Sequence, residues 1–258
     1  MFASENLNKF AALGKDFRIE ARETIQKIMK GAKPDGVTVL DAKDVKMALP
    51  VFIRDYTDFY SSKNHAYNIG VMFRGEANAL QPNWLHLPVG YHGRASSIVV
   101  DGTPITRPKG QICNDGVTPT FEACLRLDFE LEMGTIIGKA NDIGCPIKIG
   151  DAKDHIFGYT MLNDWSARCM QKWEYVPLGP FNAKNFASTI SAWVVTPEAL
   201  APFKVALPTQ EPGLLPYLQD KDLSSYDINL SVGIKTPSMD DFHTVTNSNM
   251  KHLYYSVA

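Results

Sequence analysis

The sequence contains no long apolar run and no cluster of basic residues. A membrane-spanning helix needs about 18 or more consecutive apolar residues, and no stretch of the chain approaches that length. With 26 basic and 28 acidic side chains, the formal net charge is −2, which provides no basic surface for a nucleic-acid backbone. The first residues lack the basic and apolar regions of a secretory signal. We therefore expect neither a membrane nor a nucleic-acid partner, and we expect the chain in the cytosol.

Cysteine is also scarce. The chain has four cysteines, Cys113, Cys124, Cys145 and Cys169, and no two of them form the C-x-x-C pair that is typical of metal sites. Nothing in their spacing indicates the disulfide framework of a secreted protein. We interpret all four as reduced thiols that pack like small apolar side chains. Cys169 lies near a polar cluster described below and could be partly exposed, but a core or surface role is the favoured interpretation.

The chain is long enough to bury a sizeable core, with 258 residues of which 45% are hydrophobic. A helix is predicted over residues 10–28, where apolar residues recur every three or four positions. We expect a boundary near Pro50. Residues 1–49 are predicted to be the remnant of an N-terminal domain and a linker, because one amphipathic helix cannot form a core of its own. Residues 50–258 are predicted to form a second, larger domain, to which the resemblance described below assigns the catalytic site.

The predicted fold is mainly β with a few helices, an α+β fold. Strands are predicted over residues 97–100, 126–137, 155–162, 189–196 and 226–235, and helices over 63–73 and 165–173. The last predicted strand lacks the neighbours that a sheet needs. We therefore expect the C-terminal part of the domain to be missing.

The segment Leu125–Met133 alternates between apolar residues at odd positions and charged residues at even ones, which predicts a half-buried strand. Asp128, Glu130 and Glu132 share its polar face, where neighbours lie about 6.8 Å apart. Two interpretations stay open. The face is either the solvated side of an antiparallel sheet, or a divalent cation such as Ca²⁺, which prefers carboxylate oxygens, draws these side chains together.

A second acidic position, Asp164, follows the strand predicted over residues 155–162. Arg168 and Gln171 lie four and seven residues further on, so a helix starting at Asp164 would carry all three on one face. Asp164 either caps this helix or joins Glu130 and Glu132 on a cation. In the second interpretation, Arg168 and Gln171 point at an anionic ligand, because a guanidinium group suits a carboxylate.

A third polar cluster runs from Asp58 to His65 and continues to Arg74. His65 could act as a general base, because the usual pKa of histidine lies near neutrality; the alternative is a structural histidine. Arg74, Tyr60 and Tyr91 could bind a substrate or, taken singly, could be surface or packing residues. The spacing of this cluster does not decide between these roles.

Several longer motifs resemble the fumarylacetoacetase family of hydrolases, which act on carbon–carbon bonds in ketonic substances. The motifs are DYTDFYSS (55–62), PNWLHLPVGYHGR (82–94), ELEM (130–133), NDWSAR (163–168) and QKWEYVPLGPF (171–181). The resemblance covers essentially the whole chain. It implies a β-roll catalytic domain preceded by a small SH3-like domain, a homodimer, and a Ca²⁺ or Mg²⁺ site in each active centre.

The resemblance also implies a role for each candidate residue. It places the base on His65 and the substrate contacts on Tyr60, Arg74, Tyr91, Gln171 and Tyr175. The cation ligands fall on Asp58, Glu130, Glu132 and Asp164, with Arg168 as a helper. Lys184 and Ser188 match positions associated with a second cation or with holding a substrate oxygen. Because an ammonium group does not bind a metal ion, we favour an electrostatic role for Lys184.

The reaction that the resemblance implies is hydrolysis of 4-fumarylacetoacetate to fumarate and acetoacetate, the last step of tyrosine and phenylalanine catabolism. One alternative is a non-catalytic, truncated chain that associates with full-length enzyme or is unstable, because it would expose strand edges. Another is a hydrolase of a related keto acid of the acylpyruvate type. The motif at residues 171–181 argues for fumarylacetoacetate.

Overall fold

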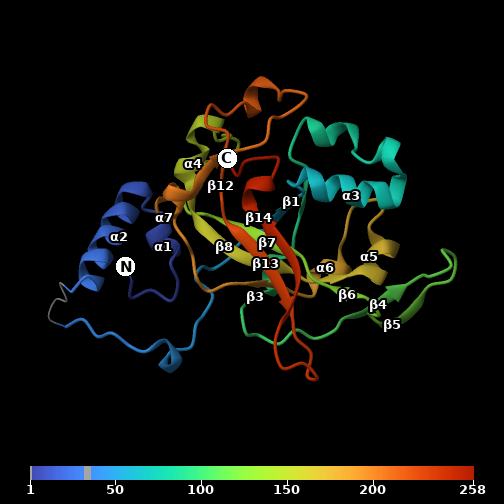
Figure 1. Ribbon diagram of the computed structural model, residues 1–258, viewed down its shortest axis with the longest axis horizontal. Coiled ribbons are helices and arrows are strands. Elements are labelled where there is room, and N and C mark those ends of the chain that lie inside the picture. The colour runs from blue at the N-terminus through green and yellow to red at the C-terminus, as the bar shows by residue number, and fades with distance from the viewer. Residues whose placement is uncertain (1, 32–35) are drawn as a thin grey trace.

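The computed structural model describes residues 2–31 and 36–258, and a four-stranded sheet lies at its centre (Figure 1). The strands follow the order β3 (Ile98–Val100), β10 (Ser188–Ile190), β8 (Ile156–Asp164) and β7 (Leu131–Ile137). β3 and β10 are parallel, whereas β10, β8 and β7 are antiparallel neighbours. Since β8 has a partner on each edge, most of its residues are buried, which agrees with its apolar sequence.

Antiparallel strand pairs surround this sheet. They are β1 (Thr57–Phe59) with β2 (Gly90–His92), β4 (Lys109–Ile112) with β5 (Thr120–Ala123), β6 (Leu127–Asp128) with β9 (Ser166–Ala167), β11 (Lys204–Ala206) with β12 (Ser224–Tyr226), and β13 (Asn229–Ile234) with β14 (His243–Asn249).

The helices cover two opposite sides of the central strands. They are α1 (Asn8–Ala11), α2 (Lys15–Met29), α3 (Lys63–Arg74), α4 (Ala152–His155), α5 (Arg168–Glu174), α6 (Asn182–Asn185) and α7 (Pro197–Leu200). Short 3₁₀ helices lie at Ala42–Asp44, Glu76–Asn78, Pro82–Leu85, Ala95–Ser97, Ile149–Asp151, Ala201–Phe203, Pro216–Leu218 and Met250–His252. In Figure 1, α1 and α2 lie to the left of the sheet, and α3, α5 and α6 lie to its right. The prediction of a mainly β fold with a few helices is confirmed. Within the described residues, no helix combines the length and hydropathy that a bilayer span requires.

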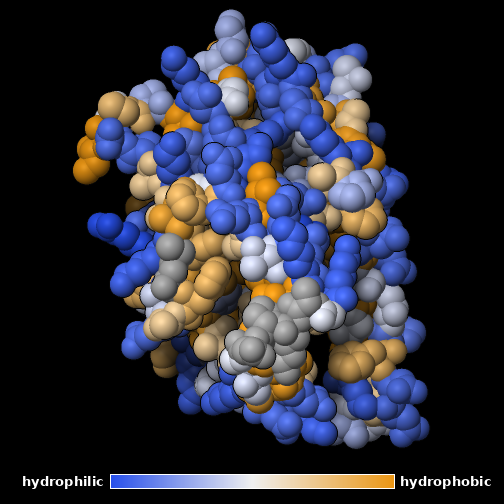
Figure 2. Space-filling model, turned by 90° about the vertical axis from the view of Figure 1, so that its left-hand side faces the viewer, coloured by the Kyte–Doolittle hydropathy of each residue, from blue (hydrophilic) through white to orange (hydrophobic). Residues whose placement is uncertain are grey.

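The predicted N-terminal helix is interrupted. Gly14, with a φ of 88°, separates α1 from α2, and this conformation suits glycine because it has no Cβ. The apolar face of α2 is not its buried face, since Phe17 and Ile25 are each 54% exposed. Figure 2 shows this side of the molecule, where apolar side chains reach the surface among hydrophilic ones.

The residue that α2 buries is Arg18. Its Nε and Nη2 donate to the two carboxylate oxygens of Glu198 at 3.0 and 2.8 Å, and its Nη1 donates to the carbonyl of Ile156 at 3.0 Å. A charge-assisted, bidentate contact of this kind fixes both position and orientation. The helix is therefore attached to α7 and β8 by an ion pair that hydrophobic periodicity cannot reveal.

Three other predicted elements have different bounds. The strand predicted over 126–137 is divided into β6 and β7, because residues 127–128 pair with β9 while residues 131–137 pair with β8. The strand predicted over 189–196 shortens to β10, beyond which Val195 makes only an isolated bridge to Tyr159. The helix predicted over 165–173 starts at Arg168, because residues 166–167 form β9.

These bounds correct the interpretation of Asp164. It is the last residue of β8 and not a helix cap, so it does not share a helix face with Arg168 and Gln171. The three residues still lie close together in the chain, because only the short strand β9 separates β8 from α5.

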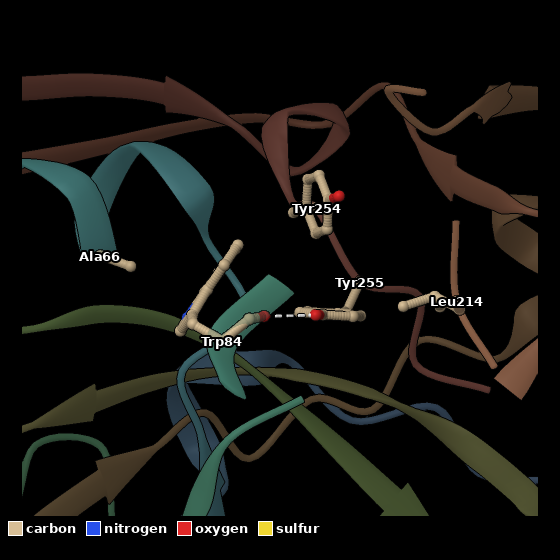
Figure 3. Close-up of a cluster of buried hydrophobic side chains, with 5 residues drawn as sticks. All are labelled: Ala66, Trp84, Leu214, Tyr254 and Tyr255. Carbon is tan, nitrogen blue, oxygen red and sulfur yellow. Dashed lines mark hydrogen bonds between the residues drawn. The ribbon is translucent and has the colours of Figure 1, made fainter. Parts of the chain in front are cut away.

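An aromatic cluster anchors α3 to the rest of the domain (Figure 3). Its buried members are Ala66, Trp84, Leu214, Tyr254 and Tyr255. The Trp84 ring lies 5.2 Å from the Tyr254 ring and 5.4 Å from the Tyr255 ring, between centroids, and the Tyr255 hydroxyl donates to the Trp84 carbonyl. The Trp84 Nε1 donates to the Tyr60 carbonyl at 2.9 Å. Because Ala66 lies on α3, this cluster holds the helix that carries His65.

Candidate active site

Four carboxylates come together at one end of the central strands. Asp58 lies on β1, Glu130 just before β7, Glu132 on β7 and Asp164 at the end of β8. One oxygen of each side chain lies within 4.8 Å of the others. Asp164 is buried and the other three are half-buried. The structure thus brings together the four residues that the resemblance implies as cation ligands; their binding of a cation stays a prediction.

Local hydrogen bonds position these side chains. The backbone N–H of Glu130 donates to the Asn163 side-chain oxygen at 3.2 Å, and the N–H of Asp164 donates to the Glu130 carbonyl at 3.3 Å. Ser188 lies opposite Asp164 in the β10–β8 register, and its hydroxyl donates to Asp164 Oδ1 at 2.8 Å. The break between β6 and β7 is therefore held by one side-chain and one backbone hydrogen bond, and it places Glu130 beside Asp164.

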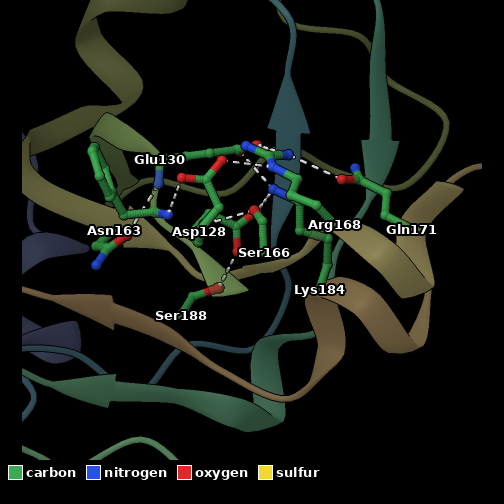
Figure 4. A network of polar contacts seen from close by, with 10 residues as sticks. Asp128, Glu130, Asn163, Ser166, Arg168, Gln171, Lys184 and Ser188 are labelled. Carbon is green, nitrogen blue, oxygen red and sulfur yellow. Dashed lines mark hydrogen bonds and ion pairs between the residues drawn. The ribbon is translucent and has the colours of Figure 1, made fainter. Parts of the chain in front are cut away.

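Two basic side chains lie against the carboxylates (Figure 4). Lys184, on α6, is only 7% exposed, and its Nζ lies 2.6 Å from Glu130 Oε2 and 2.9 Å from Asp164 Oδ2. The Arg168 guanidinium contacts Glu130 Oε1 and Asp128 Oδ2, each at 2.8 Å. Asp128 is therefore paired with Arg168 and does not join the four-carboxylate cluster, although alternation places it on the same strand face as Glu130 and Glu132.

The charge of this group is negative. Five carboxylates and two basic groups give 2 − 5 = −3 when all are ionised. Burial and the nearby Asp58, Asp164 and Glu130 raise the pKa of Glu132 to about 10, and burial and Asp164 raise the pKa of Asp58 to about 6. Hard divalent cations prefer such a set of carboxylate oxygens, so the residues present fit Ca²⁺ or Mg²⁺.

Lys184 and Glu130 stabilise each other's charged forms. Burial alone would lower the pKa of Lys184, but Glu130 and Asp164 outweigh this effect and raise that pKa. Burial alone would raise the pKa of Glu130, but Lys184 and Arg168 outweigh it and lower that pKa. These contacts are electrostatic, and the role of Lys184 in the site stays a prediction.

Two tyrosine hydroxyls are buried beside the carboxylates. Within the described residues, the hydroxyls of Tyr56 and Tyr91 have no hydrogen-bond partner. Burial, followed by the charge of Asp58, raises the pKa of both, so they stay protonated and can donate a hydrogen bond. Tyr91 lies opposite Asp58 in the β1–β2 register. Tyr56 is not among the site residues predicted from the sequence. It lies two residues before Asp58 on an extended segment, so strand alternation would place the two side chains on the same face.

Gly93 makes room for Tyr56. A Cβ at position 93 would lie 2.2 Å from Cδ1 of the Tyr56 ring, a distance that real Cβ atoms do not adopt. The glycine in the motif at residues 82–94 therefore lets β1 and the segment after β2 approach closely.

His65 lies in the first turn of α3, next to Tyr60. The His65 backbone N–H donates to Ser62 Oγ at 3.3 Å, which caps the helix, and the ring meets Tyr60 edge-on at 5.3 Å between centroids. The side chain keeps access to solvent, while the protein around the ring disfavours the charged form and lowers the pKa of His65. A neutral imidazole at pH 7 can accept a proton.

The remaining predicted residues lie on α3 and α5 or at their ends. Arg74 donates to the carbonyls of Asn78 and Ala79 at 3.0 and 2.6 Å, so its guanidinium is held at the end of α3. Gln171 Oε1 accepts from Arg168 at 2.9 Å. The exposed Tyr175 ring lies 6.4 Å from the Phe73 ring, between centroids, and thus joins the end of α5 to α3.

Comparison with known proteins agrees with this architecture. The family model described as fumarylacetoacetate (FAA) hydrolase C-terminal matches residues 55–258. A fumarylacetoacetase of Dictyostelium discoideum is 55% identical over 271 aligned residues, which cover 100% of this chain and 63% of that protein. The fumarylacetoacetase of Bos taurus is 50% identical over 266 residues, which cover 100% of this chain and 64% of that protein. The chain thus spans less than two thirds of the length of these relatives.

A solved structure supports the fold. A protein of Mycobacterium smegmatis described as HpcE matches with a TM-score of 0.51 at 18% identity, over 92% of this chain and 65% of that chain. On the sequence matches, which cover the whole chain at about half identity, the chain belongs to the fumarylacetoacetate hydrolase family.

Proposed function

We propose that the chain hydrolyses the carbon–carbon bond of 4-fumarylacetoacetate to give fumarate and acetoacetate. The observation that carries this proposal is the cluster of four carboxylates, Asp58, Glu130, Glu132 and Asp164, with Lys184 in contact with Glu130 and Asp164. The cluster lies in a chain about half identical to fumarylacetoacetases. The four carboxylates would hold Ca²⁺ or Mg²⁺. When bound, the cation supplies positive charge that polarises the oxygens of a β-diketo acid.

His65 is the proposed general base. Its lowered pKa keeps the imidazole neutral at pH 7, so it can take a proton from a water molecule. The resulting hydroxide adds to the carbonyl carbon, and the carbon–carbon bond then breaks. The electron pair of that bond leaves with the acetoacetate fragment as an enolate, which takes up a proton. The sum is one substrate and one water converted into two acids.

The other residues position the reactants. Arg74, held by two backbone carbonyls, provides positive charge for the carboxylate end of the substrate, and Gln171, held by Arg168, provides an amide. Tyr60, Tyr91 and Tyr175 are the proposed aromatic contacts. Lys184 and Ser188 orient Glu130 and Asp164, because groups that hydrogen-bond to metal ligands fix their geometry. Orientation of this kind can supply a large part of the rate.

The family resemblance supports two further parts of the proposal. One is a homodimer, which light scattering after size exclusion would detect as twice the 28.7 kDa of the chain. The other is a place in the cytosol, in tyrosine and phenylalanine catabolism. The four free thiols suit a reducing compartment.

The test is hydrolysis of fumarylacetoacetate by the purified chain with added Ca²⁺ or Mg²⁺, and with a chelator as control. We expect turnover that the chelator abolishes. Glu130→Gln keeps the shape of the side chain but removes its charge, so we expect weaker calcium binding and a turnover lower by at least about 10–100-fold. Glu122→Gln, on β5, is the matched control and should leave both unchanged.

The outcomes separate the parts of the proposal. Turnover that survives the chelator, or equal turnover in the two variants, would show that the carboxylate cluster is not the catalytic centre. Calcium binding by a folded chain without turnover would support the cation site and refute the activity, which would favour the non-catalytic alternative.

A further inference from the structure

Two of the four cysteines are in contact with each other. The Sγ atoms of Cys124 and Cys169 lie 3.4 Å apart and share a hydrogen bond. Cys124, directly after β5, is 1% exposed, whereas Cys169, the second residue of α5, is half-buried. The other two differ: the Cys113 thiol donates to Asp115 at 3.3 Å, and Cys145 is exposed. The chain therefore contains one thiol pair and two single cysteines for comparison.

The backbone explains why this pair meets. β6 and β9 are antiparallel, with Leu127 opposite Ala167, and the N–H of Arg168 extends the ladder by donating to the Arg126 carbonyl at 2.9 Å. Arg168 is the first residue of α5, so the ladder ends there. Cys169 directly follows Arg168, and Cys124 lies two residues before Arg126, so this hydrogen bond brings the segments of the two cysteines together.

The side chains need only a small movement. A disulfide bond is about 2.05 Å long, so the two sulfur atoms must approach by about 1.35 Å from their separation of 3.4 Å. Rotation of the two side chains about χ1 changes the distance between the two sulfur atoms. The pair also lies in a packed cluster with Ile112, Ala167, Met170 and Ala183, which keeps both thiols close together.

The two thiols differ in reactivity. Burial raises the pKa of Cys169, but hydrogen bonds from the backbone around it and from the Cys124 thiol outweigh burial and lower that pKa. Burial raises the pKa of Cys124. Thiolates and not thiols react with oxidants. Cys169, which solvent also reaches, is therefore the group that reacts first, and Cys124 is the partner that resolves it.

We propose that Cys124 and Cys169 are a redox modification site, at which a peroxide converts the thiol pair into a reversible intramolecular disulfide. The Cys169 thiolate attacks one peroxide oxygen, the O–O bond breaks, and a sulfenic acid and hydroxide form. Cys124 then loses its proton, its sulfur attacks the Cys169 sulfur, and hydroxide leaves as the S–S bond forms. Two thiols and one hydrogen peroxide give one disulfide and two waters, and a dithiol reductant reverses the change.

The position of the disulfide gives it a role. Cys169 follows Arg168, which contacts Asp128 and Glu130, and it precedes Gln171 on α5. A covalent bond from Cys169 to the end of β5 would tie the first turn of α5 to the strand segment that leads to Asp128. Oxidation would therefore act next to the candidate active site. Formation of the disulfide does not depend on the proposed function; only its effect on turnover does.

The test uses the folded full chain carrying Cys145→Ser, which removes the exposed thiol. After graded hydrogen peroxide, free thiols are blocked with N-ethylmaleimide, and the non-reduced digest is examined by mass spectrometry. We expect the loss of two of the three remaining thiols, a peptide pair linked through Cys124 and Cys169, and recovery of both thiols with dithiothreitol. The thermal midpoint should rise on oxidation, because a disulfide restricts the unfolded chain.

Variants and outcomes decide the proposal. Cys169→Ser should abolish the linked peptide and leave the thiol of Cys124 intact, while Cys113→Ser should leave the linked peptide unchanged. Survival of all three thiols under peroxide would overturn the proposal. So would over-oxidation of Cys169 without a link to Cys124, or a link that forms only in urea. If the disulfide forms in a chain that has no turnover, the redox site stands and the proposed function fails.

Discussion

Lys184→Met should destabilise the cation-free chain and make it respond more strongly to calcium. The Lys184 ammonium is buried between Glu130 and Asp164, with contacts of 2.6 and 2.9 Å. Methionine fills a similar volume with a flexible apolar side chain, but it removes both ion pairs. The formal charge of the group changes from −3 to −4, so the carboxylates lose their closest compensating charge.

The size of the effect follows from the burial of the pair. Removing one partner of a buried ion pair costs about 3–5 kcal/mol, because the other charge is left uncompensated. Protonation limits the cost here, since a buried carboxylate without a partner raises its pKa and becomes neutral. We therefore expect about 3 kcal/mol at pH 7. For a chain of this size, that corresponds to a fall of about 6–12 °C in the melting temperature.

The deficit should depend on pH with a defined sign. Lys184 lowers the pKa of Glu130, which stabilises the fold above the pKa of the unfolded chain and is lost as the pH falls. In the variant, Arg168 still contacts Glu130 but Lys184 is gone, so the folded pKa of Glu130 is higher than in the parent and less stability is gained as the pH rises. The difference between the two proteins should therefore be small at pH 5 and larger at pH 8.

Urea unfolding followed by tryptophan fluorescence, in the presence of a chelator, measures this difference. Lys184→Met should lower the midpoint without changing the slope m, and excess calcium should raise the midpoint of the variant more than that of the parent. Lys172→Met, an exposed position on α5, is the matched control. Equal midpoints for the two variants, or a deficit that does not vary between pH 5 and pH 8, would refute this reasoning.

Three further predictions concern the same region. Without a cation, the pKa of Glu132 is raised to about 10 and that of Asp58 to about 6. Calcium binding at pH 7 should therefore release about one proton, and the affinity for calcium should rise with pH. Calorimetry in two buffers of different ionisation enthalpy should give different heats of binding, and identical heats would contradict this prediction. A Gly→Ala substitution in a helix normally stabilises it by about 1 kcal/mol. Gly70→Ala should instead destabilise the chain by about 1–3 kcal/mol, because the new Cβ would lie 1.7 Å from the Ala79 carbonyl oxygen. A melting temperature equal to or above that of the parent would disprove the close approach. Any turnover should fall at low pH as His65 becomes protonated, with an apparent pKa below the usual 6.5. His65→Gln should lower turnover by about 100-fold or more and remove this fall at low pH. A fall that persists in the variant would belong to another group.

The residues of the candidate site could be selected from the sequence because they lie in extended motifs. Strand alternation places Glu130 and Glu132 on one face, and the structure keeps them close together. The same alternation wrongly adds Asp128, because the pairing of β6 with β9 takes this residue to Arg168, 40 positions away. Which partner a strand chooses is a tertiary property, and periodicity carries no information about it.

The N-terminal helix shows a second limit. Apolar spacing predicts that Phe17 and Ile25 are buried, but α2 is attached through Arg18 to Glu198, which lies 180 positions further along the chain. An ion pair between distant segments leaves no pattern in either one. Contact between the thiols of Cys124 and Cys169 is hidden for the same reason, since it depends on the register of two short strands.

The four carboxylates come from three segments that are far apart in the chain, around positions 58, 131 and 164, so the outermost pair is separated by 164 − 58 = 106 residues. Such a site does not exist until the central strands have paired, because closing so long a loop in the unfolded chain is unfavourable. A cation held there would therefore act late, on the native state rather than on the folding transition state. It would lengthen the lifetime of the folded chain by slowing unfolding, and it would leave the folding rate nearly unchanged.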